Sequence, residues 1–445
     1  MSTASVHGHF DFTQQSKSRR FWKICTDAAS GRARRHPSAM IYAQTELKSE
    51  RSMVNDTRQL NRMAVLTELL RIRPASRKQL AAASGISAAT VTRAVEQLIA
   101  EGVVVEASEL VSVQRGRRAV LLDVVADRAF VVGIDLGASN TRMLLADLVG
   151  TPIARRELVT PVEADAAHLA EWLASAAREI AGERWQRVAG LRLGLPGAVG
   201  RDGSTISNAP NLPQVEASGF LELVRAAADR PVGADNDANL ALLGEQHFGA
   251  ARAAPTAVMV TIGAGLGAGI AIDGRILRGA RGVVGEFGQL PAGPLGTRLE
   301  LMVTGPGIMR LAAEAGVRLD SPADLFATDA SEPVRALRAH FDQAMLIVLT
   351  AATVSCEPEV IVLGGGIAKS LARDLGRYET VLEHHLGAAP RLLASELGDF
   401  AGATGAVVAA LHEVYRGMGI DERAFGDLPV ATADEPEPEP ADRPR

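Results

Sequence analysis

Three short segments between residues 57 and 101 carry apolar side chains at helical spacing. The first predicted helix, Thr57–Arg71, has its apolar residues near the 3.6-residue period: Leu60, Met63, Ala64, Leu66 and Leu70. Pro74 ends this helix, because proline lacks the amide proton that a helix needs. Ser76 can cap a second helix, Arg77–Ser84, and Gly85 can end it with a positive φ.

The third predicted helix, Ala88–Glu101, follows Ser87, which can cap it. One face is apolar and must pack on the first two helices: Val91, Val95, Leu98 and Ile99. The opposite face carries small and polar side chains: Ala89, Thr90, Arg93 and Gln97. A helix of this kind can present its polar face to the major groove of DNA. We therefore predict that these four residues and Ser87 contact DNA.

Two β-prone runs, Val103–Val105 and Val120–Val124, follow the helices and predict a hairpin. Its tip carries three arginines around one glycine, Gly116: Arg115, Arg117 and Arg118. Because Gly116 permits a tight turn, these arginines can approach a phosphate backbone or a narrow minor groove. Residues 55–125 thus predict a winged helix-turn-helix DNA-binding domain. The alternative is a three-helix protein-interaction module with a solvated charged loop.

From residue 130 onward, apolar strands end in glycine turns. The first strand carries one acid, Asp135, and leads into a turn of small residues. Such a carboxylate can orient metal-bound phosphates, and the backbone N–H groups of the turn can hold them. Two more glycine turns follow the strands Ala257–Ile262 and Val360–Leu363. The predicted nucleotide-binding residues are Asp135, Gly137, Ser139, Gly263, Gly265, Gly267 and Gly365.

Each glycine turn alone is equally typical of a tight connection. Their order is more informative, because two strand-rich halves with similar turns resemble the duplicated lobes of sugar kinases and actin. The chain has no GxxxxGK[ST] sequence, which disfavours a P-loop fold, and the glycines at 263–267 lack the βαβ context of a Rossmann site. Any nucleotide would bind between the lobes.

Charge is unevenly distributed along the 445 residues. Residues 1–130 hold 20 Lys+Arg and 12 Asp+Glu, a balance of +8, whereas the remainder holds 27 and 40, a balance of −13. A basic segment can release counterions from a phosphate backbone, which would repel an acidic one. DNA, if bound, is bound by the N-terminal part.

Cysteine content and apolar runs bear on the cellular compartment. The two cysteines, Cys25 and Cys356, are too few for a disulfide framework, and no run of about 18 apolar residues or signal peptide occurs. We expect a cytoplasmic protein without membrane contact. Residues 1–54 are expected to be a disordered extension, unless translation begins at Met40 or Met53, and residues 425–445 a disordered acidic, proline-rich tail.

Seven motifs between residues 57 and 415 give the chain a resemblance to transcriptional regulators of the ROK family, named for repressors, open reading frames and kinases. They are GIDLGASNTR at 133–142, GLPGAV at 194–199, SNAPNL at 207–212, DNDANLALLGE at 235–245, TIGAGLGAGI at 261–270, GEFG at 285–288 and IVLGGGIA at 361–368. The resemblance implies a two-lobed α/β domain of the actin and sugar-kinase type (ribonuclease H-like) over residues 130–415. Family kinases lack the N-terminal winged helix that family regulators possess.

The resemblance also implies a sugar site between the lobes. Its residues offer amides and carboxylates to sugar hydroxyls: Asn208, Asn211, Asn236, Asp237, Glu286, Gln289 and Glu300. Asp237 matches the general base of the family's kinases, and a carboxylate within hydrogen-bond reach of the attacking hydroxyl suits that step. The alternative role for Asp237 is to cap the helix that begins there. Both roles can coexist.

Several positions depart from the family pattern. Gln289 stands where the family has a histidine that binds sugar and zinc, and the zinc-binding cysteines are replaced by residues such as Pro291, Gly293 and Arg298. A glutamine without thiolates cannot build a tetrahedral zinc site, so zinc is not expected. The first phosphate turn has Ala138 for glycine and Ser139 for threonine, which disfavours nucleotide binding.

The sequence therefore predicts a transcriptional regulator, a repressor of carbohydrate-related genes, whose kinase-like domain senses a sugar or sugar derivative. A homodimer, or a dimer of dimers, would bind a palindromic operator. No cofactor is required on this interpretation. The alternative is an ATP-dependent sugar kinase, using ATP and Mg²⁺, that retains a DNA-binding domain. A third interpretation makes the C-terminal part a dimerisation scaffold that binds no ligand.

Overall fold

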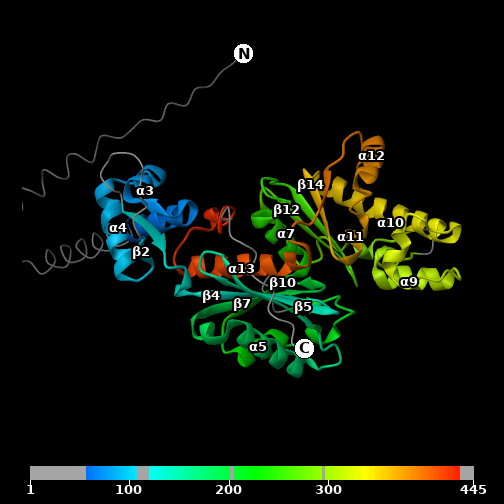
Figure 1. Cartoon of the computed structure of the whole chain (residues 1–445), viewed down its shortest axis with the longest axis horizontal. Helices are drawn as coiled ribbons and strands as arrows, with labels where there is room; N and C mark the ends of the chain where they lie inside the picture. Colours follow the sequence, from blue (N-terminus) through cyan, green and yellow to red (C-terminus); the bar gives the residue numbers. More distant parts are fainter. Residues whose placement is uncertain (1–56, 108–119, 201–204, 293–295, 431–445) are drawn as a thin grey trace, which may run out of the picture. The chain divides into compact units, whose positions relative to one another are not determined.

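The structure is a computed structural model that describes residues 57–107, 120–200, 205–292 and 296–430 (Figure 1). Residues from Asn61 onward form one compact unit, which contains every labelled helix and strand from β1 to α13. The predicted N-terminal extension, the wing arginines Arg115, Arg117 and Arg118, and Gly293 lie outside the described residues.

The N-terminal domain has the predicted helical order. A helix over residues 57–72 precedes α3 (Arg77–Ser84) and α4 (Ala88–Ala100), and a small sheet with the order β1-β3-β2 completes the domain. Its strands are β1 (Ala75–Ser76), β2 (Val104–Ala107) and β3 (Leu121–Val124). The predicted caps are confirmed: Ser76 forms a capping box with Gln79, Gly85 has φ +68°, and Ser87 accepts from Thr90 N.

The buried face of the first helix differs from the predicted one. Its fully buried side chains are Val65, Leu66, Leu69 and Leu70. Leu60, expected on this face, is 62 % exposed, because the apolar stripe against α3 and α4 begins a turn later. On α4, Val91, Val95 and Leu98 are buried as predicted, whereas Ile99 is half-buried.

The first lobe is a five-stranded sheet with the order β10-β7-β4-β5-β6. Its strands are β4 (Phe130–Leu136), β5 (Asn140–Asp147), β6 (Pro152–Val159), β7 (Val188–Leu195) and β10 (Val232–Asn236). The first three pair in antiparallel fashion, while β4, β7 and β10 are parallel. Helices α5 (Ala166–Ala181) and α6 (Phe220–Ala228) cover one face, and a ribbon of β8 (Ala198–Val199) and β9 (Ile206–Ser207) lies beyond β7.

The second lobe repeats this topology in a sheet with the order β13-β12-β11-β14-β15. Its strands are β11 (Ala257–Ile262), β12 (Leu266–Ile272), β13 (Arg275–Ile276), β14 (Val360–Gly364) and β15 (Arg391–Ala394). Again three strands are antiparallel and three parallel, which confirms the predicted duplicated, two-lobed fold. The helices of this lobe are α8 (Glu300–Val303), α9 (Gly305–Glu314), α10 (Glu332–Cys356), α11 (Gly366–Leu371) and α12 (Leu375–Leu386).

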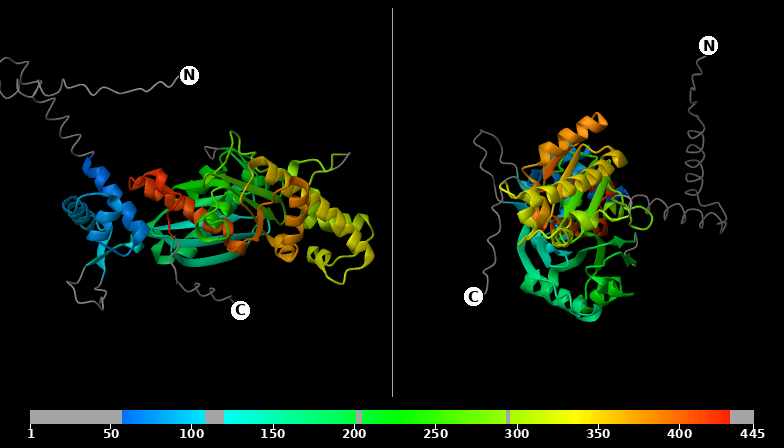
Figure 2. Two further views of the ribbon diagram at one scale, coloured as in Figure 1. Left: turned by 90° about the horizontal axis from the view of Figure 1, so that it is seen from above. Right: turned by 90° about the vertical axis from the view of Figure 1, so that its right-hand side faces the viewer.

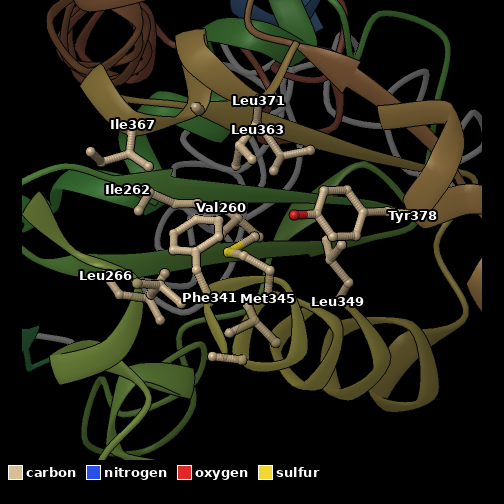
Figure 3. Close-up of a cluster of buried hydrophobic side chains, with 14 of the residues drawn as sticks. Val260, Ile262, Leu266, Phe341, Met345, Leu349, Leu363, Ile367, Leu371 and Tyr378 are labelled. Atoms are coloured by element: carbon tan, nitrogen blue, oxygen red, sulfur yellow. The ribbon is translucent and has the colours of Figure 1, made fainter. Parts of the chain in front are cut away.

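Helix α10 and its neighbours form the core of the second lobe (Figure 3). Phe341, Met345 and Leu349 of α10 pack against sheet residues such as Val260 and Leu363. Among the described residues, α10 is the one helix with the length and hydropathy of a membrane span, but this buried face explains its apolar composition. The right view of Figure 2 shows α5 and α10 on the outer sides of their sheets.

Two helices, α7 (Asp237–Phe248) and α13 (Ala401–Gly417), lie between the two sheets (Figure 1). After α13, a short 3-10 turn (Glu422–Ala424) leads into a segment expected to belong to the disordered tail. Residues 425–430 instead pack on the protein, and Leu428 is fully buried in the core shared with the N-terminal domain. Residues 425–430 therefore belong to the folded part of the protein.

Candidate ligand cleft and DNA-binding surface

Two carboxylates meet where strands of the first sheet end. Asp135 is the penultimate residue of β4, and Asp237 is the first residue of α7, directly after β10. The intervening strand β7 has Gly194 beside them, where a Cβ would lie 3.6 Å from Asp135 Oδ1 and 3.4 Å from Asp237 Cα. The parallel strands and this missing side chain thus bring the two predicted site residues together.

The second lobe adds two more acids to this cluster. Asn208 donates from Nδ2 to Glu286 Oε2 at 2.9 Å. At Gly265 a Cβ would lie 3.4 Å from Glu300 Oε1 and 3.8 Å from Asn211 Nδ2, so both side chains border the second glycine turn. Asn211 also donates to the carbonyl of Ala264 at 3.5 Å. Five of the predicted sugar-site residues therefore gather around this turn: Asn208, Asn211, Asp237, Glu286 and Glu300.

Asp135, Asp237 and Glu286 are harder to ionise than free carboxyls. Burial, followed by the charge of Asp237, raises the pKa of Asp135 to about 7. Burial raises the pKa of Asp237 to about 6. Burial, and then the charges of Asp237 and Glu300, raise the pKa of Glu286 to about 7. Near neutral pH each of these three carboxyls is therefore partly protonated. The cluster can then both accept hydrogen bonds from hydroxyl groups and donate to them.

Asn236 and Asp237 have different local roles. The Asn236 side chain caps α7 by accepting from Asn239 N at 3.0 Å, and it donates to Gly197 O at 2.9 Å. The alternative that Asp237 is the helix cap is therefore wrong, since Asn236 fills that position. Asp237 Oδ1 accepts from Ala238 N at 2.7 Å and lies 3.7 Å from the Cβ position of Gly267. Sugar contact by Asn236 stays a prediction.

Residues 289–292 pair with residues 297–299 in the stretch where the resemblance places the family's zinc ligands. Gln289 Oε1 accepts from Arg298 Nη1 at 3.0 Å, and Pro291 pairs with Arg298 through the backbone. Leu299 N donates to Leu290 O at 3.0 Å, directly before Glu300. Among the described residues, no three His, Cys, Asp or Glu side chains are arranged to hold a metal ion. Hydrogen bonds thus join the two sides of the segment that leads into Glu300.

The predicted phosphate turns are formed, with additional charges beside them. Gly137 N donates to Asn140 O at 3.1 Å, and Ser139 is exposed. Gly365 has φ +87°, and a Cβ there would overlap the backbone of Ile262, so only glycine fits. Gly263 is open around its Cβ position. Nucleotide contact by all of these residues stays a prediction.

Two charged residues beside the first turn were missed from the sequence. Lys369 Nζ, from α11 of the second lobe, lies 2.7 Å from Asp399 Oδ2. The same oxygen lies 3.8 Å from Arg142 Nη2, and Arg142 is a residue of the first motif. No local pattern could have identified this pair, because Lys369 and Asp399 meet only through the fold.

The proposed DNA-binding face of α4 is open. Ser87, Ala89, Arg93 and Gln97 are exposed, and Thr90 is half-buried. Ser87 Oγ lies 2.9 Å from Thr90 Oγ1 at the start of the helix. Gln97 Nε2 donates to Glu101 Oε1 at 2.9 Å, and Glu101 is ion-paired with Arg62. The predicted DNA-contacting residues of α4 thus share one accessible face.

Two curated relatives are repressors by name. The xylose repressor of Caldicellulosiruptor bescii is 32% identical over 235 residues, which are 52% of this chain and 58% of that protein. The N-acetylglucosamine repressor of Escherichia coli O6:H1 is 30% identical over 252 residues, 55% of this chain and 60% of that protein. The chain thus spans about three fifths of the length of these relatives.

Two solved structures are similar to this fold. The ROK hexokinase from Thermus thermophilus is 32% identical, with a TM-score of 0.54, and the match covers 65% of this chain and 100% of that one. A ROK family transcriptional regulator, a homologue of the E. coli MLC protein, is 21% identical with a TM-score of 0.66 and covers 83% of this chain and 99% of that one. The second likeness concerns the fold alone.

Family models match both parts of the chain. A winged helix-turn-helix DNA-binding model matches residues 59–105. The ROK family model matches residues 131–413, which is more than half of the 445 residues. The chain belongs to the ROK family.

Proposed function

We propose that this protein is a DNA-binding transcriptional repressor whose ROK domain senses a sugar or sugar derivative. One observation carries the proposal: the winged domain that exposes the polar face of α4 shares one hydrophobic core with the first lobe of the sugar-kinase-like domain. Leu66 and Leu122 of the winged domain belong to the same buried cluster as Val131 and Tyr415. A change in the lobes can therefore reach the DNA-binding face through packed side chains.

The ligand proposed for the cleft is a neutral sugar with several hydroxyl groups. Asn208 and Asn211 offer amide donors and acceptors, and Glu286 and Glu300 add carboxyl oxygens. Two relatives are named for xylose and N-acetylglucosamine, and both sugars present arrays of hydroxyls. Ligand binding must favour one arrangement of the lobes, because equal affinity for two arrangements would shift neither.

The assembly proposed on DNA is a homodimer, or a dimer of such dimers, on a palindromic operator. Two symmetry-related α4 helices would occupy half-sites separated by about 34–36 Å or a multiple of this helical repeat. The protein would act in the cytoplasm without a cofactor, and zinc would not be needed, because Gln289 and Arg298 close the loop by a hydrogen bond.

Genome-wide mapping of bound DNA, followed by fluorescence anisotropy on the mapped sites, tests the proposal. We expect nanomolar binding to a sequence with two-fold symmetry and a change of at least about fivefold with one sugar of a panel that includes D-xylose and N-acetylglucosamine. If the protein binds no DNA sequence selectively, the proposal that it is a transcriptional regulator is refuted. Selective binding without any thermal shift from sugars would favour the ligand-free scaffold, because a ligand at 100 times its Kd stabilises a protein by about 2.7 kcal/mol.

The second candidate function is an ATP-dependent sugar kinase that retains a DNA-binding domain. The observation that favours it is the Asp237 carboxyl, whose pKa of about 6 suits a general base near neutral pH. The altered first turn, with Ala138 and Ser139, opposes it. An ADP-release assay with ATP, Mg²⁺ and a panel of hexoses and amino sugars decides between them. Turnover that disappears in Asp237→Asn would establish the kinase.

A further inference from the structure

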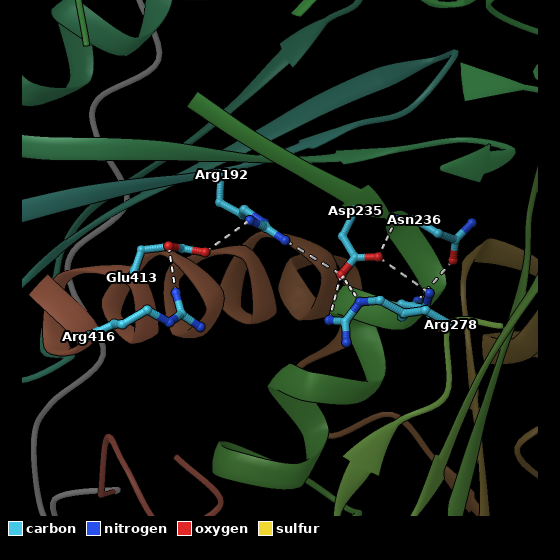
Figure 4. Close-up of polar contacts among 7 residues, drawn as sticks. Arg192, Asp235, Asn236, Arg278, Glu413 and Arg416 are labelled. Carbon is cyan, nitrogen blue, oxygen red and sulfur yellow. Dashed lines mark hydrogen bonds and ion pairs between the residues drawn. The ribbon is translucent and has the colours of Figure 1, made fainter. Parts of the chain in front are cut away.

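A buried aspartate joins the two lobes directly beside the cleft (Figure 4). Asp235 of β10 is 4% exposed, and its Oδ2 accepts from Arg278 Nε at 2.8 Å and Nη2 at 2.7 Å. Arg278 follows β13 in the second lobe, so this ion pair connects the lobes. Removing such a partner from a buried carboxylate is costly, because the charge has already lost its solvation on burial and then also lacks a counter-ion.

The same aspartate fixes the backbone that carries the cleft residues. Asp235 Oδ1 accepts from Asn236 N at 2.9 Å and from Asn239 Nδ2 at 3.4 Å. Asn236 caps α7, and Asp237 begins it. Arg278 therefore acts on the start of α7 through Asp235 without being one of the predicted sugar contacts.

A second arginine, Arg192, lies between Asp235 and Glu413 of helix α13. Arg192 Nη2 lies 3.7 Å from Asp235 Oδ2, and Arg192 Nη1 lies 3.7 Å from Glu413 Oε1 of α13. Glu413 Oε2 in turn pairs with Arg416 Nη1 at 2.6 Å (Figure 4). Both distances are long for ion pairs. If Arg192 moved closer to one of the two acids, it would move away from the other, and this would be a second arrangement of the ion pairs.

Helices α7 and α13 are in backbone contact. A Cβ on Gly244 of α7 would lie 2.7 Å from Ala401 O and 2.9 Å from Gly405 N of α13. A Cβ on Gly405 would overlap the carbonyl oxygen of Leu240. Because real side chains do not approach this closely, the glycines set the distance between the helices. A displacement of one helix would therefore have to carry the other with it.

The end of α13 contacts the DNA-binding domain. The carbonyl of Met418, which follows the last residue of α13, accepts from Arg62 Nη1 at 3.5 Å. Arg62 also donates from Nε to Glu101 Oε2 at 3.0 Å, and Glu101 Oε1 accepts from Gln97 of α4 at 2.9 Å. Three side chains thus connect the end of α13 to the DNA-binding face.

We propose that Arg278 is a positioning residue whose ion pair with Asp235 sets the α7–α13 pair, and that this pair transmits the state of the cleft to Gln97 through Arg62 and Glu101. This coupling rests on the proposed function and describes how the state of the cleft would regulate DNA binding. In the arrangement described, Arg278 holds Asp235 and leaves Arg192 shared with Glu413. When the lobes move and Arg278 withdraws, Arg192 closes on Asp235 and releases Glu413, and α13 shifts against the winged domain.

The decisive test needs no ligand. Hydrogen exchange is followed by mass spectrometry on the full chain carrying Arg278→Gln, with Arg275→Gln, an exposed arginine of β13, as the matched control. We expect exchange to become at least about fivefold faster in peptides covering the end of α13 and the end of α4 in Arg278→Gln alone, which corresponds to about 1 kcal/mol. Changes confined to residues 232–240 and 276–282, or equal changes in the control, would overturn the proposal.

A second arm uses Glu413→Gln, a half-exposed position whose substitution does not threaten folding. D-xylose and N-acetylglucosamine serve as probes, and DNA selected from a random pool serves as the target. We expect the sugar-dependent ratio of DNA affinities to fall at least about fivefold towards one, while the sugar's own Kd in the absence of DNA stays within about twofold. An undiminished ratio would contradict the coupling. If no sugar changes DNA binding by the wild type, the proposed function fails, and the exchange experiment alone decides the coupling.

Discussion

Replacing Glu286 by glutamine is expected to stabilise the protein in a pH-dependent way. Glu286 is half-buried and has a pKa of about 7, against 4.5 for an ordinary glutamate, because burial and the charges of Asp237 and Glu300 disfavour its ionised form. Glutamine has nearly the same shape and keeps an oxygen that can accept from Asn208 Nδ2. It removes the charge and leaves the packing in place.

Proton linkage determines whether the stability of the wild type rises or falls with pH. Between about pH 4.5 and 7 the folded state holds a proton on Glu286 that the unfolded state has lost, so stability falls as pH rises through this window. The difference in pKa is worth about 3 kcal/mol at most, since a tenfold change in proton affinity is worth about 1.4 kcal/mol. Solvent screening at a half-buried site reduces this, and we expect a gain of about 1–2 kcal/mol for Glu286→Gln at pH 8.

Urea unfolding of the wild type and Glu286→Gln at pH 5, 6, 7 and 8 measures this difference. Glu171→Gln is the control, because Glu171 is exposed and lies on α5, outside the acid cluster. We expect the variant and the wild type to agree within about 0.5 kcal/mol at pH 5, to diverge between pH 5 and 7, and to keep a nearly constant difference above pH 7. A difference that is constant with pH, or a destabilised variant at pH 8, would refute the reasoning.

Three further predictions concern other parts of the molecule. Arg93→Ala should relax base specificity, whereas Arg117→Ala should weaken binding to all sequences alike, and competition assays on operator variants distinguish these effects. Gly405→Ala should destabilise the fold by about 2 kcal/mol or more in thermal unfolding, because its Cβ would overlap the Leu240 carbonyl. Arg298→Ala should weaken sugar binding about tenfold in calorimetry by freeing the loop before Glu300, and EDTA should leave wild-type binding unchanged.

Local signals explain why much of the N-terminal domain could be predicted. Ser76 and Ser87 cap helices, and Gly85 ends one, through interactions within three residues of sequence. Such chemistry is independent of the remainder of the fold. The duplicated lobes were predictable for a related reason, because each lobe repeats a strand followed by a glycine turn, and Gly365 stands where no other residue fits.

Other features depend on surfaces far apart in the sequence and escaped prediction. Leu428 lies in a polar, proline-rich stretch, yet it is fully buried in a core shared with the winged domain. Leu60 matches the helical period and is exposed, because only the later turns of its helix meet a partner. The ion pair of Asp235 and Arg278 spans 43 residues, and neither neighbourhood marks it in the sequence.

The residues at the family's zinc positions and the acid cluster fit the same proposed function. The proposed sugar sensor needs the segment that leads into Glu300, and Gln289 and Arg298 are joined by a hydrogen bond in this segment. A kinase must in addition hold phosphates at the first turn, and that is where Ala138 and Ser139 depart from the family. The departures from the family pattern thus fall at the predicted phosphate turn and zinc positions, while amides and carboxyls that can bind hydroxyl groups line the proposed sugar site. Such a division is expected of a cleft that binds a sugar in order to move a neighbouring domain, since binding energy then has to distinguish two arrangements of the protein and has no transition state to stabilise.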